Sequence, residues 1–357
     1  MSLRERGSRY GAAVMFSAGI AAAMLVTASI QAGFRPPFEI WLGGALVVTF
    51  ILYARAGFAL SSTRRELELM RGQTSKLSEH SEAIITEQLQ LEQNDGISEA
   101  DASILADVRK AIECDSVDLY LQPIVSLPQR KTRYFEAFSR LRCDNGAIIT
   151  PSVYIDAAER ANKIGAIDNL ILLRVVQSLR QLGPEAQHYK VFCNISPATL
   201  YDREFFDNFS DYLDANSDLA SRLVFELTWP AVEMINGVVE KSIASIAERG
   251  FAFSLDHIRR FDLNWSTIRN RNFRYIKAPS AMLLAENHRD EQGRMRVQDF
   301  RKKLSDHGID LIVEKVELER HVPEIVALGI DFGQGELFGA PRSAKFYLGT
   351  EELARAS

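Results

Sequence analysis

The chain has 357 residues, which is long enough for a barrel of about 250 residues plus additional segments. Its hydrophobic and charged contents, 46% and 25%, are those of a globular protein, and its formal net charge of −5 argues against a general nucleic-acid binder. The three cysteines, Cys114, Cys143 and Cys193, lack CxxC spacing, so we expect small core residues in a reducing compartment rather than a zinc site.

Two apolar runs occupy most of the first 60 residues. Residues 10–30 carry no charge, and residues 40–60 carry only Arg55. Each run has about the ~20 residues that a helix needs to cross a hydrocarbon core. The first run is too long for the core of a signal peptide, and Arg55 lies near enough to the end of the second run to reach the interface. We therefore predict two transmembrane helices within residues 10–60, with a buried core helix as the alternative for the second run.

Basic residues predict how these helices are oriented. Several lie before the first helix and after the second, whereas the link between the helices holds only Arg35. The flanking residues are Arg4, Arg6, Arg9, Arg64 and Arg65. Because lysine and arginine concentrate on the cytoplasmic side of a membrane, we expect both termini to be cytoplasmic.

Residues 61–97 are predicted to form a helical linker. The segment is polar and lacks proline, and apolar residues recur every seven positions at Met70, Leu77, Ile84 and Leu91. The other seam position of that heptad is mostly polar, so a weak coiled coil and a solvated single helix both fit the pattern. Asn94-Asp95-Gly96 then ends the helix, and a barrel domain is expected over residues 98–350.

Residues 118–334 repeat one pattern, in which a short apolar run ends on a polar residue and a longer stretch follows. Eight such runs are expected to be strands, and stretches such as 167–182 and 231–249 are expected to be helices. Strands that alternate with helices favour a parallel sheet, and eight of them favour a closed (β/α)8 barrel of the TIM type. The polar residues that end the runs are Gln122, Glu136, Asn194, Glu226, Asp256, Lys277, Glu314 and Gln334.

These polar residues are expected to meet at the carboxyl ends of the strands, where barrel enzymes carry their sites. Any one of them could be a strand cap or a local salt bridge, but eight in register favour a site. Glu136, Glu226 and Asp256 supply carboxylates and Asn194 supplies an amide oxygen. Such hard donors suit Mg²⁺ or Mn²⁺ and not Zn²⁺.

Two basic residues complete the predicted site. Lys277 supplies a compact cation for an anionic substrate or a polarised water, and Arg140 can grip a phosphate with two N–H groups. A metal held by carboxylates beside basic residues is typical of enzymes that hydrolyse phosphodiesters, in which metal ions activate water and offset the charge of the phosphate.

The chain resembles the EAL family of cyclic-di-GMP phosphodiesterases over about residues 104–343. The signature reads Glu136-Ala-Phe-Ser-Arg140, with Phe138 in place of the name-giving leucine. Other segments resemble the family's QPIV, N-x-S, ELTE, EGVE and GQGYLFG motifs, and they begin at Gln122, Asn194, Glu226, Glu314 and Gly333. Diguanylate-cyclase motifs are absent from the sequence.

The resemblance implies roles for the polar residues. The implied metal ligands are Glu136, Asn194, Glu226 and Asp256. The residues implied to act on the attacking water and the substrate are Lys277, Glu314 and Gln334. Gln122 and Arg140 would touch the nucleotide, and Glu317 would brace the loop that follows Asp256.

One loop departs strongly from the family pattern. The family's DDFGTG reads Asp-His-Ile-Arg-Arg-Phe at residues 256–261, so His257 replaces the second acid and both glycines are absent. His257 could be an ordinary loop histidine or a ligand for Mn²⁺, which accepts imidazole better than Mg²⁺ does. Arg259 and Arg260 are expected to repel a cation nearby.

Other departures also affect expected site positions. Pro279 replaces a further family acid, Lys315 replaces the EGVE glycine, Trp229 replaces the last acid of ELTE, and Glu336 replaces the tyrosine of GQGYLFG. Loss of one ion from a two-metal site should cost several kcal/mol of transition-state stabilisation, which lowers the rate by orders of magnitude. Because these acids are missing, we expect at most one Mg²⁺ or Mn²⁺ site.

The predicted function is a cyclic-di-GMP receptor or scaffold, anchored in the bacterial inner membrane by two spans, with negligible hydrolysis. Two alternatives stay open: a working phosphodiesterase that uses one metal or a Mn²⁺ pair to make pGpG, and a protein-interaction barrel that no longer binds nucleotide. The layout is similar to that of TipF-type regulators of polar flagellum assembly. A protein partner is expected, nucleic acid is not, and a homodimer is left open.

Overall fold

The computed structural model describes residues 79, 81–89, 97–142, 148–181, 188–233 and 235–348. The two transmembrane helices predicted within 10–60 lie outside these residues. Across the ranges that the structure describes, no helix combines the length and the apolar character needed to cross a membrane.

The end of the predicted linker is helical over residues 81–88. Ile85 in this helix and Leu89 directly after it are each only 2% exposed. Glu82 lies 3.2 Å from the guanidinium of Arg174, which belongs to helix α5 (Ile164–Gln181) of the barrel domain. The linker therefore has a direct ionic contact with the helices that surround the barrel.

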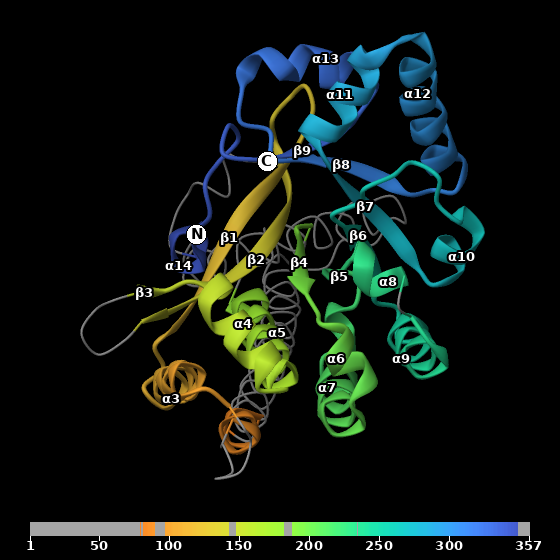
Figure 1. Ribbon diagram of the computed structural model, residues 1–357. Coiled ribbons are helices and arrows are strands. Elements are labelled where there is room, and N and C mark those ends of the chain that lie inside the picture. Colours follow the sequence, from red (N-terminus) through yellow and green to blue (C-terminus); the bar gives the residue numbers. More distant parts are fainter. Residues whose placement is uncertain are drawn as a thin grey trace, which may run out of the picture. The chain divides into compact units, whose positions relative to one another are not determined.

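Eight strands close into a barrel, as the sequence predicts (Figure 1). Parallel pairing runs from β2 through β4, β5, β6, β7 and β8 to β9, and β1 closes the ring by pairing with both β2 and β9. The strands are β1 (Val117–Ser126), β2 (Thr132–Arg142), β4 (Lys190–Asn194), β5 (Leu223–Thr228), β6 (Ala252–Asp256), β7 (Phe273–Pro279), β8 (Asp310–Glu314) and β9 (Phe332–Gln334). The short strands β3 (Ile148–Ile149) and β10 (Arg342–Ser343) pair at the margins.

Strand β1 runs antiparallel to both of its neighbours, so the prediction of an all-parallel (β/α)8 barrel is wrong at this strand. Only residues 127–131 separate β1 from β2. Parallel neighbours need a crossover of about a dozen residues or more, whereas antiparallel neighbours need only a turn. The short connection therefore forces a hairpin, which continues outward until Val117 lies opposite Leu141.

Helices surround the strands (Figure 1). They are α3 (Glu99–Glu113), α4 (Pro151–Arg160), α5, α6 (Pro197–Tyr201), α7 (Arg203–Ala215), α8 (Trp229–Glu233), α9 (Gly237–Glu248), α10 (Trp265–Asn270), α11 (Ser280–Arg289), α12 (Glu291–Asp306), α13 (Val322–Ala327) and α14 (Ala344–Leu348). The helix predicted at 167–182 corresponds to α5. The helix predicted at 231–249 is two helices, because Asn236 caps α9 by accepting hydrogen bonds from the backbone N–H groups of Val238 and Val239.

The barrel interior is filled by one side chain from each of its strands. Ile124, Phe192, Val224, Tyr275 and Ile312 are buried together, and Tyr134, Ala252 and Phe332 pack against them. Successive side chains on a strand alternate between faces, so a residue two positions away points inward again. Seven of the eight polar residues predicted to form the site hold these inward positions, directly above the apolar layer. On β6 that position is Ser254, and Asp256 lies two residues farther along the strand.

Candidate functional site

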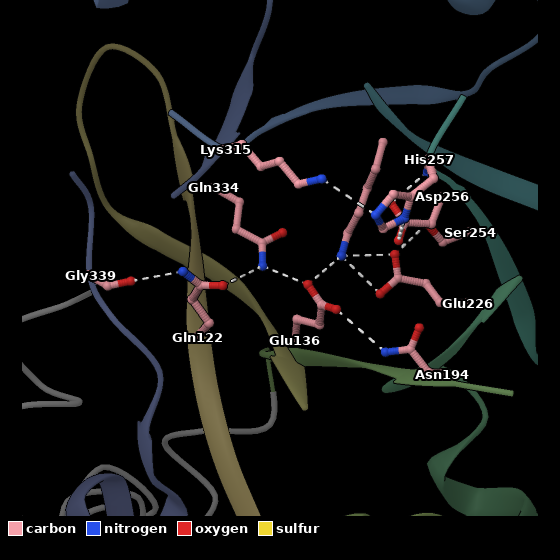
Figure 2. A network of polar contacts seen from close by, with 11 residues as sticks. Gln122, Glu136, Asn194, Glu226, Ser254, Asp256, His257, Lys315, Gln334 and Gly339 are labelled. Carbon is pink, nitrogen blue, oxygen red and sulfur yellow. Dashed lines mark hydrogen bonds and ion pairs between the residues drawn. The ribbon is translucent and has the colours of Figure 1, made fainter. Parts of the chain in front are cut away.

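A buried ammonium group lies at the centre of the barrel mouth. Lys277 on β7 is 0% exposed, and its Nζ lies 2.6 Å from Glu136 Oε2 and 2.8 Å from the carboxylate of Glu226. Figure 2 shows both glutamates within the polar network of the mouth. Burial by itself lowers the pKa of Lys277, but the carboxylates of Glu136, Glu226 and Asp256 outweigh it and raise the pKa above that of a free lysine. Lys277 is therefore a permanent cation that joins strands β2, β5 and β7.

Amide side chains hold the carboxylate of Glu136 in a fixed orientation. Gln334 Nε2 donates to Glu136 Oε2 at 2.6 Å and to Gln122 Oε1 at 3.0 Å. Gln122 Nε2 in turn donates to the carbonyl of Gly339 at 3.1 Å, and Asn194 Nδ2 lies 3.4 Å from Glu136 Oε1. Because β1 is antiparallel, Gln122 lies in the middle of its strand, directly opposite Glu136, and not at a carboxyl end.

The other half of the mouth is formed by Asp256, His257 and Glu314. One potential ligand atom from each residue lies within 4.8 Å of the other two. The His257 ring, through Nδ1, hydrogen-bonds Asp256 Oδ2 at 2.5 Å. Burial opposes ionisation of Asp256, but the hydrogen bonds from His257 and the charge of Lys277 outweigh it, so the pKa of Asp256 is lowered. The hydrogen bond to Asp256 raises the pKa of His257, whereas burial and the nearby Asp256 raise the pKa of Glu314.

The residues of the mouth fit a divalent cation. Four buried carboxylates, those of Glu136, Glu226, Asp256 and Glu314, face one buried ammonium group, Lys277. Glu314 Oε1 is also buried without a hydrogen-bond donor among the described residues. Buried acceptors need a donor or a cation, and carboxylate oxygens suit Mg²⁺ or Mn²⁺. A single bound ion would offset the excess negative charge of the mouth.

The structure therefore brings together most of the residues predicted from the sequence. Those that meet at the mouth are Gln122, Glu136, Asn194, Glu226, Asp256, Lys277, Glu314 and Gln334. Arg140 lies farther out on β2, on the same face as Glu136, with its guanidinium 5.6 Å from the ring of Tyr120. The guanidinium has no hydrogen bond or ion pair within the described ranges, which leaves its N–H groups open to an anionic ligand.

Two expectations about the mouth differ from the observed contacts. Arg260 does not point a free charge at the carboxylates, because its guanidinium lies 3.0 Å from Glu233 and over the ring of Trp229. Glu317 is exposed, and no hydrogen bond from it to the loop at 257–261 is seen among the described residues. Lys315 instead reaches that loop, with its Nζ 3.4 Å from His257 Nε2.

Asp168 on α5 is a supporting residue that the sequence reasoning missed. Its buried carboxylate accepts hydrogen bonds from the backbone N–H of Ser196 at 2.6 Å and the hydroxyl of Thr199 at 2.5 Å. These contacts fix the turn after β4, which carries Asn194. Burial raises the pKa of Asp168 to about 7. An acidic residue within the apolar run of α5 is the signal that could have identified it.

A family comparison agrees with this geometry. The sequence model of the EAL domain matches residues 105–341. This chain belongs to the EAL domain family. The matched region holds all of the polar mouth residues, and it ends within the segment that follows β9.

Two curated relatives have names that include cyclic di-GMP phosphodiesterase. "Probable cyclic di-GMP phosphodiesterase PdeG" of Escherichia coli K12 is 23% identical over 239 residues, which cover 66% of this chain and 46% of that protein. "Cyclic di-GMP phosphodiesterase PdeB" of Shewanella oneidensis is 24% identical over 247 residues, which cover 67% of this chain and 28% of that protein. The chain thus spans less than half the length of these relatives.

Solved EAL structures share the fold. The PaMucR phosphodiesterase in complex with c-di-GMP matches with a TM-score of 0.60 and 21% identity, over 69% of this chain and 99% of that chain. The FimX EAL domain from Pseudomonas aeruginosa, bound to c-di-GMP, matches with a TM-score of 0.56 and 20% identity, over 68% of this chain and 96% of that chain. At 20–21% sequence identity, the likeness to these structures shows a shared fold and nothing further.

Removal of the central ammonium group should destabilise the barrel. Lys277→Met leaves Glu136 and Glu226 buried without their cation, so in EDTA the free energy of unfolding should fall by about 3–5 kcal/mol. Mg²⁺ should raise the melting temperature of this variant more than that of the native protein, because the ion replaces the lost charge. Thermal melting by intrinsic fluorescence measures both effects, with Lys302→Met on the exposed face of α12 as the control. An equal response to Mg²⁺ in both proteins contradicts this assignment.

The buried Asp168 predicts a pH dependence of stability. Its pKa is about 7 in the folded protein and 3.8 in the reference state, so the folded state binds the proton more tightly. The contribution of Asp168 to the free energy of unfolding should therefore decrease as pH rises from about 4 to about 7, by more than about 1 kcal/mol. Asp168→Asn should flatten the stability curve in this window, whereas Asp107→Asn on the exposed face of α3 should not. Parallel curves for the native protein and Asp168→Asn would refute the prediction.

Proposed function

We propose that this EAL domain is a cyclic-di-GMP receptor that hydrolyses the dinucleotide slowly or not at all. The observation that carries the proposal is an asymmetry at the barrel mouth. The half built from Gln122, Glu136 and Lys277 is complete and held by hydrogen bonds. The half that surrounds Asp256 contains His257 and Lys315 where the motifs have an acid and a glycine.

Several features support nucleotide binding. Arg140 and Gln122 lie on the face of the β1–β2 hairpin that continues outward from Glu136, so an anion above the mouth can reach both. Arg140 can make two parallel N–H contacts with a phosphate. The PaMucR and FimX domains that share this fold are described in complexes with c-di-GMP, and we infer the same ligand for this chain.

The contacts of His257 support weak hydrolysis. A second metal ion needs an anionic or neutral donor with a lone pair, but Nδ1 of His257 is already bonded to Asp256, and Nε2 faces the ammonium of Lys315. With one ion in place of two, transition-state stabilisation falls by several kcal/mol, which corresponds to a rate lower by orders of magnitude.

An active phosphodiesterase is the second candidate function. It is favoured by the cluster of Asp256, His257 and Glu314, whose potential ligand atoms lie within 4.8 Å of one another. Imidazole together with carboxylates suits Mn²⁺, so this candidate predicts turnover in Mn²⁺ that is absent in Mg²⁺. A protein-interaction barrel without nucleotide is disfavoured by the retained polar network at the mouth.

Membrane attachment is part of the proposal. The uncharged run at 10–30 and the second apolar run at 40–60 support a two-span anchor in the bacterial inner membrane, with the EAL domain in the cytoplasm. Such an anchored receptor would relay nucleotide binding to a protein partner. A role in flagellum assembly rests on the layout alone and stays a prediction.

The deciding experiment measures binding and hydrolysis together. The detergent-solubilised chain is titrated with cyclic-di-GMP in EDTA, Mg²⁺ and Mn²⁺ by calorimetry, and chromatography of the same samples measures pGpG. We expect binding with little or no pGpG. Arg140→Ala should weaken binding at least about tenfold through the loss of charge-assisted hydrogen bonds, whereas Arg133→Ala, at the other end of β2, should not.

The outcomes separate the three functions. Rapid pGpG formation in Mg²⁺ would contradict the receptor function and support an active phosphodiesterase. Turnover confined to Mn²⁺ would support a one-site or Mn²⁺-specific enzyme. If the native chain has no affinity for cyclic-di-GMP in any buffer, the protein-interaction barrel remains.

The topology can be tested with Cys114, which is exposed. In a Cys143→Ser background, a membrane-impermeant maleimide should leave Cys114 unlabelled in intact cells and label it after permeabilisation, because the domain is expected on the cytoplasmic side. The Cys114→Ser variant is the control for background labelling. Labelling of Cys114 in intact cells would overturn the orientation.

A further inference from the structure

Lys315 lies immediately after β8 and extends toward the loop that follows β6. Its Nζ is 3.4 Å from Nε2 of His257, a residue 58 positions earlier in the chain (Figure 2). Lys315 follows directly after Glu314, so it brings a second ammonium group to the carboxylates of the mouth. Lys277, the first, is buried between Glu136 and Glu226.

The backbone at Lys315 is held in an unfavourable conformation. Its φ is +57° and that of His257 is +55°, a left-handed region that costs a non-glycine residue free energy. The hydroxyl of Ser280 donates to the Lys315 carbonyl at 2.9 Å, and the N–H of Val316 donates to the Gln334 carbonyl at 3.0 Å. These bonds clamp both sides of the residue, so the strand end fixes the direction in which the lysine leaves the backbone.

A neighbouring glycine makes the clamp rigid. A Cβ built on Gly335 would lie 2.2 Å from the carbonyl oxygen of Val316, so only glycine allows these backbones to approach so closely. Strained non-glycine conformations persist where the surroundings enforce them, and they gather at functional sites. Lys315 and His257 are two such residues, and they contact each other.

The contacts of His257 occupy both of its ring nitrogens. The carboxylate of Asp256 can only accept, so the proton lies on Nδ1, and the donor-only ammonium of Lys315 then faces the lone pair of Nε2. A divalent ion placed here would also be repelled by the charge of Lys315. The half of the mouth around Asp256 therefore has a cation of its own.

We propose that Lys315 supplies the positive charge that a second metal ion would bring to this mouth, so that a cyclic dinucleotide phosphate binds with one divalent ion or none. This inference rests on the proposed receptor function. An ammonium group offers a compact charge and three N–H donors, which suit a phosphate oxygen. An ammonium group does not activate water as a metal ion does. A lysine in place of the second ion therefore still attracts phosphate but does not supply the activated water that hydrolysis needs.

Calorimetry in EDTA tests the binding role of Lys315. Lys315→Gln should weaken binding of cyclic-di-GMP at least about fivefold, whereas the control Lys302→Gln, with the same loss of charge on exposed α12, should leave it unchanged. Lys315→Gly should weaken binding similarly while raising the melting temperature, because glycine relieves the left-handed backbone. Affinity of Lys315→Gln equal to that of the native protein overturns the proposal.

A titration with Mn²⁺ tests the metal role independently of the nucleotide. The native protein and the double variant His257→Asp with Pro279→Asp, which restores both acids, should each bind at most one ion. The triple variant that adds Lys315→Gly should bind two, seen as a spin-coupled pair by electron paramagnetic resonance. Two ions in the native protein or in the double variant, or only one in the triple variant, overturns the proposal. If the native chain binds no cyclic-di-GMP, the receptor function fails, and the ion stoichiometry still decides whether Lys315 excludes the second ion.

Discussion

The buried ion pairs of Lys277 determine how the barrel mouth is arranged. An ammonium group that is 0% exposed is tolerated only because the carboxylates of Glu136 and Glu226 lie 2.6–2.8 Å away. Those three residues belong to β2, β5 and β7, so the same contacts that offset desolvation also hold the strand ends at fixed distances. Gln334 and Asn194 then orient Glu136 by hydrogen bonds, and Gln122 accepts a hydrogen bond from Gln334.

The apolar layer below explains how these polar groups can share so small a space. Each strand contributes one inward residue to the layer, and every strand except β6 contributes a mouth residue two positions away. On β6, Asp256 lies four positions from Ala252. Tyr134 therefore lies below Glu136, and Tyr275 lies below Lys277. Strand β1 runs in the opposite direction, so its mouth residue comes before its layer residue: Gln122 belongs to the mouth and Ile124 to the layer.

The two halves of the mouth have different chemistry. Around Glu136 the network of hydrogen bonds and ion pairs is complete, whereas around Asp256 an imidazole and an exposed ammonium group replace an acid and a glycine. The change adds positive charge and replaces a carboxylate by an imidazole. Under the proposed receptor function, a site altered in this way would still attract a phosphate diester and would cleave it slowly or not at all.

The sequence by itself determined the polar strand residues, the eight-stranded barrel and most of the mouth, because alternation along a strand is a local property that a single segment displays. It did not predict the direction of β1, the break before α9, the support of Asp168 or the contact between Lys315 and His257. The first two follow from local features, the short connection at 127–131 and the cap at Asn236, whereas the last two depend on where the chain returns. The last joins residues 58 positions apart. Only closure of the barrel brings such residues within hydrogen-bonding distance, and only the clamped backbone at Lys315 decides where its charge lies.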